Sequence, residues 1–256
     1  MRYYFIGRYR EIDKDLFVNA QEQDLGEIHK YLQTDAKLCE NFKYKVFDTR
    51  TKKQKEDPFH SVSRASARFD ELTIYRFWKP PEDPHFPHEI THLVAHTWGK
   101  SYFWQVELDT YDNQKIERKI AMLSTSFMQE GLAIAVDEIV FKRKLLEGKK
   151  EKFVDEWCRK NESRLSSISL KDVISFDGFC SIENSIVVPF AGSFSKYLLL
   201  NFGVKKFKRM YVALKETLSP QENIAILERV YQKKESQLLR EWYEYILDFP
   251  QTGYEA

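Results

Sequence analysis

The stretch PHEITHLVAHTWG, residues 87–99, marks the point where the character of the sequence changes from strand-like to helical. Four of the six histidines of the chain, His85, His88, His92 and His96, fall within a dozen residues around it. Residues four apart lie on one face of a helix, one turn above the other. The stretch therefore predicts a helix whose histidines are candidates for a metal site.

Upstream of this stretch the sequence predicts a small mixed sheet with one helix. The segment FKYKVF alternates in the period-two pattern of a half-buried strand, and LTIYRFW is rich in β-branched and aromatic residues. Strands are expected over 2–7, 42–47 and 72–78, a helix over 21–32, a polar loop over 51–58 and a proline-rich loop over 79–87.

Downstream of residue 87 almost every segment has helical spacing. Ser169 is a good helix-capping residue, and Gly203 suits the end of a helix. Helices are expected over 117–146, 151–164, 169–175, 191–201, 205–217, 220–232 and 235–247. The predicted fold class is therefore α+β, with a part of mixed structure at 1–86 and a helical part at 87–256 forming a single catalytic unit.

The composition narrows the class of protein. The chain has 256 residues, 43% of them hydrophobic, and a formal net charge of +1, which is typical of a globular protein and argues against a nucleic-acid partner. No membrane span and no signal peptide are predicted, so the expected location is cytoplasmic, or exported if a leader has been removed. Cys39, Cys158 and Cys180 are widely spaced and predict free thiols.

HEITH, residues 88–92, is an HExxH motif. On a helix, His88 and His92 can both reach one zinc ion at about 2.0–2.1 Å. Glu89 lies about 100° around the helix, beside the metal, where it can accept a proton from a water molecule. The motif predicts two ligands and one general base.

A catalytic zinc needs a third protein ligand. His96 is a poor candidate, because eight residues of straight helix place it about 12 Å from His88 along the axis. His85 precedes the helix, and His29 and His60 are distant in sequence.

Glu130 is the favoured third ligand. It lies in SFMQEGLAIAVDE, where an acidic residue sits among apolar and small residues. A carboxylate on an apolar face is costly unless it is paired or bound to a metal, and the small neighbours allow close approach of a second helix. The other interpretation is a glutamate in the first turn of a helix, favoured by the helix dipole.

HEITH followed by QEGLA resembles the gluzincin branch of the zincin metallopeptidases, and in particular the peptidase MA-like domain family. The segments 60–77, 189–211 and 226–247 also resemble the general pattern of that group, so that the resemblance covers roughly residues 40 to 247. It implies a zincin-like fold, one Zn²⁺ held by His88, His92 and Glu130, and Glu89 as general base and acid. The sequence departs from the pattern at Ile134, where many gluzincins have an aspartate that orients a zinc-bound histidine.

The function expected from this resemblance is zinc-dependent hydrolysis of peptide bonds in a peptide or protein substrate, with an unknown oligomeric state. Tyr197 and Tyr211 are candidates for stabilising the oxyanion, although packing with the hydroxyl at a surface is the favoured interpretation of either. The segment 102–115 is a candidate lid. Two other functions stay open: an inactive zincin-fold module that binds peptides or proteins, and a helical domain without metal.

Overall fold

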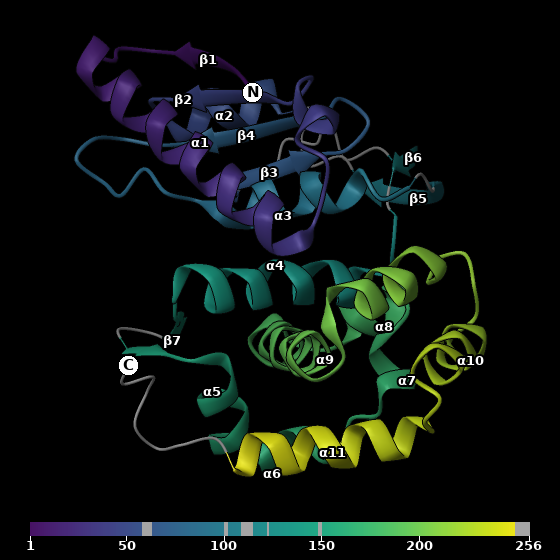
Figure 1. The fold of residues 1–256 in the computed structure, drawn as a ribbon. Helices are drawn as coiled ribbons and strands as arrows, with labels where there is room; N and C mark the ends of the chain where they lie inside the picture. Colours follow the sequence, from purple (N-terminus) through teal and green to yellow (C-terminus); the bar gives the residue numbers. More distant parts are fainter. Residues whose placement is uncertain (58–62, 100–101, 109–114, 122, 148–149, 249–256) are drawn as a thin grey trace. The chain divides into compact units, whose positions relative to one another are not determined.

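The computed structural model of the chain describes residues 1–57, 63–99, 102–108, 115–121, 123–147 and 150–248. The chain forms two compact units, Met1–Met122 and Leu123–Ala256. The first contains a mixed four-stranded sheet and the second consists mainly of helices, which confirms the α+β class (Figure 1). The predicted division after residue 86 falls inside the first unit, and the single catalytic unit stays a prediction.

The sheet of the first unit has the strand order β1-β2-β4-β3. Its strands are β1 (Arg2–Ile6), β2 (Lys43–Phe47), β4 (Thr73–Phe77) and β3 (Ala65–Arg68). The first three are parallel, with Tyr44 paired to Tyr3 and to Ile74, whereas β3 runs antiparallel to β4 at the edge. A further antiparallel pair is formed by β5 (Tyr102–Leu108) and β6 (Lys115–Ala121).

Helix α1 (Glu11–Leu32) covers one face of this sheet (Figure 1). Its Phe17 is fully buried, with its ring edge-on to Tyr44 at 5.2 Å and 4.9 Å from Trp78. Aromatic pairs at these separations add to the stability that burial of their surface provides. The short helices η1 (Ala36–Cys39) and α2 (Arg50–Glu56) and the helix α3 (Pro87–His96) complete the helices of this unit among the described residues.

The second unit is built around α9 (Asn184–Ala213). In Figure 1 this helix is seen nearly end-on, with four other helices that contact it placed around it. These are α4 (Ser126–Phe141), α5 (Val154–Lys160), α10 (Pro220–Tyr231) and α11 (Glu235–Leu247). The remaining described elements of this unit are the helices α6 (Glu162–Leu165), α7 (Leu170–Val173) and α8 (Phe176–Ser181) and the strands β7 (Leu145–Glu147) and β8 (Lys150–Lys152).

Two glycines set the close packing of α4 against α9. A Cβ atom added at Gly131 would lie 2.5 Å from the backbone oxygen of Ala191, and one added at Gly192 would lie 2.4 Å from Ile134 Cγ2. Real Cβ atoms essentially never approach other atoms below 3.0 Å, so a side chain at either position would force a neighbouring group to move. The small residues beside Glu130 thus permit close packing of α4 against α9, whereas the contact expected with the helix that carries the two histidines stays a prediction.

Several predicted elements differ from the observed ones. The helix expected over 117–146 is wrong at both ends, because residues 115–121 form β6 and residues 145–147 form β7. The polar loop expected over 51–58 is wrong for most of its length, since α2 occupies residues 50–56. Helix α1 begins ten residues before the expected start, and the two helices expected on either side of Gly203 form one element with a break at that residue. The candidate lid at 102–115 forms β5 and the start of β6, and residues 109–114 lie outside the described residues.

Among the described residues, α9 alone is long and apolar enough to cross a membrane, by length and composition. Its most apolar window is 67% buried inside the structure, and buried core helices of soluble proteins pass the same criterion. The expected absence of a membrane span and the expected location therefore stay predictions.

Candidate metal centre

The segment before α3 is held by buried side chains of α1 and the sheet. Arg76 of β4 is 1% exposed and donates hydrogen bonds to the backbone oxygens of Asp83 and Pro84. Gln21 of α1 also donates to the oxygen of Pro84, at 2.6 Å, and the indole of Trp78 donates to that of Glu82 at 3.0 Å. The prolines of this segment prevent regular secondary structure, so these side chains satisfy backbone oxygens that a helix or sheet would otherwise pair. They also fix where α3 begins.

Asp24 of α1 fixes the first residues leading into α3. Its carboxylate is 2.7 Å from Nδ1 of His85 and accepts a hydrogen bond from the backbone N–H of Phe86 at 2.9 Å. Phe86 is the residue that precedes the first turn of the helix. His85 is therefore paired with a buried carboxylate in this structure, which accounts for it without a role as a metal ligand.

His88 and His92 face each other on α3, as the spacing predicts. Their Nε2 atoms are 3.2 Å apart, and their rings stand edge to face with centroids separated by 4.8 Å. His92 is buried and His88 is half-buried. Two nitrogens at about 2.05 Å from one tetrahedral zinc ion are about 3.3 Å apart, so the observed separation suits a shared ion.

Glu89 lies in the first turn of the same helix and His96 in its last turn. Glu89 is half-buried, and its charge acts on Tyr44 of β2 and on Lys53 of α2. Burial raises the pKa of Tyr44 to about 12, with smaller effects of Arg76 and Glu89. The ring of His96 stacks on Phe69 at 4.9 Å, and the ring of Phe69 is also edge-on to His92 at 6.3 Å.

Glu130 lies on α4 in the second unit and is half-buried between buried neighbours on either side. The helix begins at Ser126, so Glu130 is its fifth residue and no acidic residue occupies the first turn. The interpretation of Glu130 as a first-turn glutamate favoured by the helix dipole is therefore wrong. The acidic residue at the start of α4 is instead Glu216, from after α9. Its carboxylate accepts hydrogen bonds from the backbone N–H and the hydroxyl of Ser126.

The two candidate tyrosines differ in their surroundings. The hydroxyl of Tyr197 donates a hydrogen bond to Glu241 of α11 at 2.8 Å. Tyr211 is 1% exposed, and burial followed by the charge of Glu130 raises its pKa above the usual range. Only Tyr211 of this pair is thus within electrostatic reach of a candidate metal ligand.

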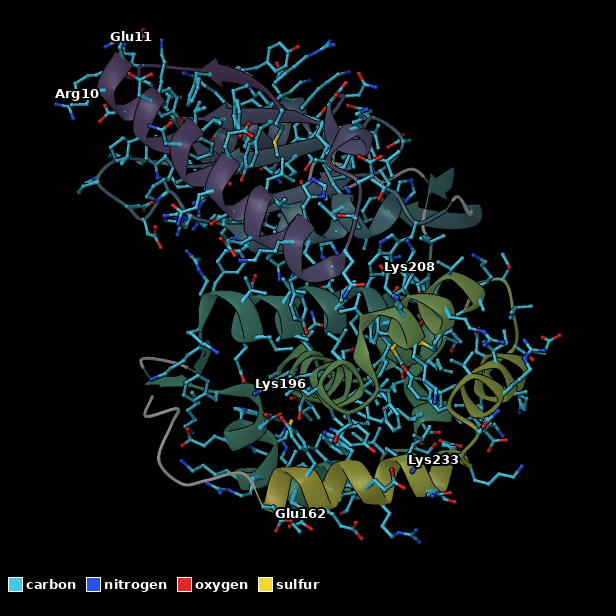
Figure 2. The ribbon with its side chains drawn as sticks, viewed as in Figure 1. Arg10, Glu11, Glu162, Lys196, Lys208 and Lys233 are labelled. Atoms are coloured by element: carbon cyan, nitrogen blue, oxygen red, sulfur yellow. The ribbon has the colours of Figure 1, made fainter. Side chains whose placement is uncertain are left out.

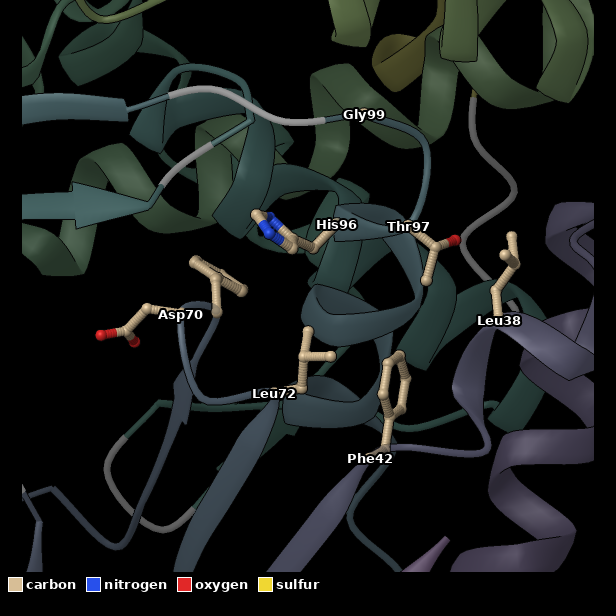
Figure 3. A pocket seen from close by; sticks show the side chains of 8 residues that line it. Leu38, Phe42, Asp70, Leu72, His96, Thr97 and Gly99 are labelled. Carbon is tan, nitrogen blue, oxygen red and sulfur yellow. The ribbon is translucent and has the colours of Figure 1, made fainter.

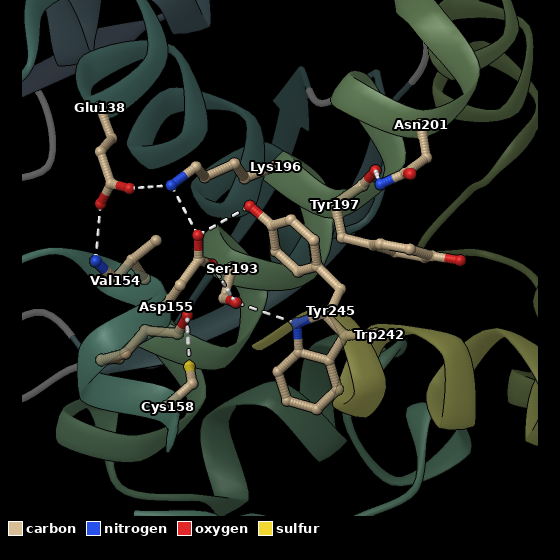
Figure 4. Close-up of polar contacts among 11 residues, drawn as sticks. Glu138, Val154, Asp155, Cys158, Ser193, Lys196, Tyr197, Asn201, Trp242 and Tyr245 are labelled. Atoms are coloured by element: carbon tan, nitrogen blue, oxygen red, sulfur yellow. Dashed lines mark hydrogen bonds and ion pairs between the residues drawn. The ribbon is translucent and has the colours of Figure 1, made fainter. Parts of the chain in front are cut away.

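A second group of charged side chains is enclosed in the helical unit (Figures 2 and 4). Lys196 is fully buried and forms ion pairs with Glu138 and, at 2.6 Å, with Asp155. Asp155 also accepts hydrogen bonds from Ser193 at 2.6 Å and from Tyr245 at 2.8 Å. These partners satisfy the buried charges, so Glu138 serves the packing of α4, α5 and α9.

The remaining sequence candidates lie elsewhere. His29 contacts the hydroxyl of Thr34 through Nδ1, and His60 lies outside the described residues. Cys39 and Cys158 are buried thiols and Cys180 is exposed. Sequence reasoning missed Phe69, Asp24 and Glu216, because none of them belongs to a recognisable motif and each acts only through a contact with a distant segment.

A search against protein-family models and a search of curated proteins each found no match to this chain.

Proposed function

We propose that this protein is a zinc-dependent metallopeptidase in which His88, His92 and Glu130 bind one zinc ion. The observation that carries the proposal is the 3.2 Å separation of the two Nε2 atoms on α3, which suits two corners of a zinc tetrahedron. Glu130 lies in the second unit, on the otherwise apolar helix α4, and is the third ligand that the sequence favours. Two imidazoles and one carboxylate are a donor set that catalytic zinc sites use.

The residues fit this role chemically. Neutral imidazole is the form that binds zinc. Glu130 supplies a negative charge that partly balances the ion. A zinc ion held there supplies Lewis acidity toward a water molecule and a peptide carbonyl.

Glu89 is the proposed general base and acid. It is next to His88 in sequence but turned about 100° from it around the helix, so its carboxylate stays off the metal. It accepts a proton from the attacking water and delivers that proton to the departing amine nitrogen. A zincin-like fold is part of the same proposal, as is a peptide or protein substrate.

The test combines zinc analysis with peptide cleavage. We expect purified protein incubated with zinc and then dialysed to cleave members of a peptide library, with cleavage abolished by a chelator. Glu89→Gln should retain zinc and lose cleavage by at least a hundredfold, since general base catalysis contributes factors of about 10²–10⁴. The matched control is Glu27→Gln, an exposed glutamate of α1.

Three outcomes separate the candidate functions. Zinc and cleavage in the native chain, with loss of cleavage alone in Glu89→Gln, support the peptidase. Zinc without cleavage of any library member favours the inactive binding module. Protein that retains no zinc contradicts the peptidase and favours a domain without metal.

A further inference from the structure

A pocket of about 340 Å³ lies in the first unit at the end of α3. Its walls come from the loop before β2, from η1, from the turn between β3 and β4, and from the last residues of α3 and those that follow (Figure 3). The side chains that shape it are Leu38, Phe42, Phe69, Leu72, His96 and Thr97. The residues that line this pocket do not include the proposed zinc ligands or Glu89.

The pocket adjoins the candidate metal ligands through one aromatic ring. Phe69 lines the pocket and stacks on His96 at 4.9 Å, and the same ring is edge-on to His92 at 6.3 Å. His92 and His96 are one helical turn apart, or about 6 Å along α3. An extended peptide advances about 3.3 Å per residue, so a side chain in the pocket belongs to a residue close to the bond at the metal.

The chemistry of the pocket selects a neutral apolar occupant. Four of its shaping side chains are aliphatic or aromatic, and no lysine, arginine or glutamate is among the described residues that line it. Asp70 contributes to the rim, but Figure 3 shows its carboxylate directed away from the cavity. A charged side chain placed there would lose its hydration without gaining a partner.

The backbone supports a functional role for the turn that forms one wall. Phe69 and Leu72 are the first and last residues of the turn between β3 and β4. Leu72 has φ of +51°, in the left-handed region that a leucine adopts only at a cost. A glycine or asparagine would remove this strain, and strained residues of this kind are found preferentially at functional sites. Leucine keeps an apolar side chain at the pocket.

We propose that this pocket is a specificity subsite that receives a neutral apolar side chain of a peptide substrate, such as that of leucine, methionine or phenylalanine. The assignment rests on the proposed peptidase function, because it makes the pocket part of the peptide-binding site. Recognition is by burial of apolar surface against Leu38, Phe69 and Leu72.

The test changes the exposed wall of the pocket. Leu38 is 53% exposed, so Leu38→Asp adds a carboxylate at the pocket with little disturbance of the core. The matched control is Leu16→Asp on α1, at a leucine that is 54% exposed and does not line the pocket. Cleavage of a peptide library is measured by mass spectrometry, and binding of N-acetyl-leucinamide and N-acetyl-lysinamide is measured by ligand-observed NMR on zinc-free protein.

The native chain should bind the leucine amide in preference to the lysine amide and should cleave peptides with an apolar residue near the cut bond. Leu38→Asp should lower kcat/KM for those peptides and the affinity for the leucine amide by tenfold or more, the range that loss of apolar pocket contacts produces. Leu16→Asp should change neither.

Equal binding of the two amides, or the same preference in Leu38→Asp as in the native chain, overturns the subsite. Preferential binding of the leucine amide in a chain that neither retains zinc nor cleaves peptides means that the proposed function has failed, and the subsite role with it, although an apolar pocket exists. Cleavage without any apolar preference overturns the subsite and leaves the peptidase function intact.

Discussion

Replacement of Gly131 by alanine tests whether close helix packing positions Glu130. The added Cβ would lie 2.3 Å from Ser195 Oγ and 2.5 Å from the backbone oxygen of Ala191. The hydroxyl of Ser195 can rotate away, whereas the backbone oxygen cannot. Ordinary contact begins near 3.4 Å, so α4 and α9 would have to separate locally by about 0.9 Å.

The expected cost follows from two opposing effects. Overpacking of a core typically costs about 1–3 kcal/mol. Alanine in place of glycine within a helix contributes about 1 kcal/mol in the opposite direction. We expect a net destabilisation of up to about 2 kcal/mol for Gly131→Ala, measured by urea unfolding of zinc-free protein followed by circular dichroism.

The matched control is Gly26→Ala in α1, where an added Cβ meets no atom within 4 Å. Without a clash, only the helix preference of alanine remains, and the change should stabilise the protein by about 0.5–1 kcal/mol. The two glycine substitutions should therefore have opposite signs. Equal stabilisation by both would refute the close contact of α4 with α9.

A second measurement on the same variant concerns the metal. Glu130 directly precedes Gly131, so movement of α4 by most of an ångström displaces the proposed ligand by more than the tolerance of about 0.2 Å in a metal site. We expect zinc affinity to fall about 10–100-fold in Gly131→Ala and to stay unchanged in Gly26→Ala.

Three further changes test other parts of the structure. Lys196→Met leaves the carboxylates of Glu138 and Asp155 facing each other without their cation, and urea unfolding should show a loss of about 3–5 kcal/mol; a loss below 1 kcal/mol would contradict the buried ion pairs. Asp24→Ala removes the acceptor for His85 and for the backbone N–H of Phe86, so the free energy of unfolding should fall by about 1–3 kcal/mol, whereas an unchanged value would mean that Asp24 does not anchor the start of α3. Burial raises the pKa of Glu216 in the folded protein, so its contribution to stability is fully present below the unfolded pKa and is lost as the pH rises through the folded pKa. The stability of Glu216→Gln relative to the native chain should therefore increase between pH 4 and pH 8 in urea unfolding, and a constant difference would contradict the raised pKa.

The elements that the sequence predicted best have strong local signals. Helix α11 spans the expected residues 235–247. Ser169 caps α7, as expected, by accepting a hydrogen bond from the backbone N–H of Asp172 through its hydroxyl. The i, i+4 spacing of His88 and His92 likewise brought their nitrogens together, because both residues belong to one helix. Such features depend on a few neighbouring residues and on regular geometry.

Features that depend on distant contacts were not predictable. Helix α2 is a polar run without apolar periodicity, and its Lys53 is buried through an ion pair with Asp57, itself bound to Arg68 of β3. The strand β3 (ASAR) has no β-branched residue, and its place at the sheet edge depends on pairing with β4. Similarly, Phe69 joins the pocket to His92 only because the turn after β3 reaches α3.

The most direct test of the proposed zinc site is the zinc content of the purified chain after dialysis, measured by inductively coupled plasma mass spectrometry. We expect about one zinc ion per native chain, and at most a small fraction of this in His88→Ala, His92→Ala and Glu130→Ala at equal protein concentration. The control His85→Asn should retain the full amount, because His85 is paired with Asp24. A native chain without zinc, or equal zinc in the native chain and all three ligand variants, would contradict the proposed metal site.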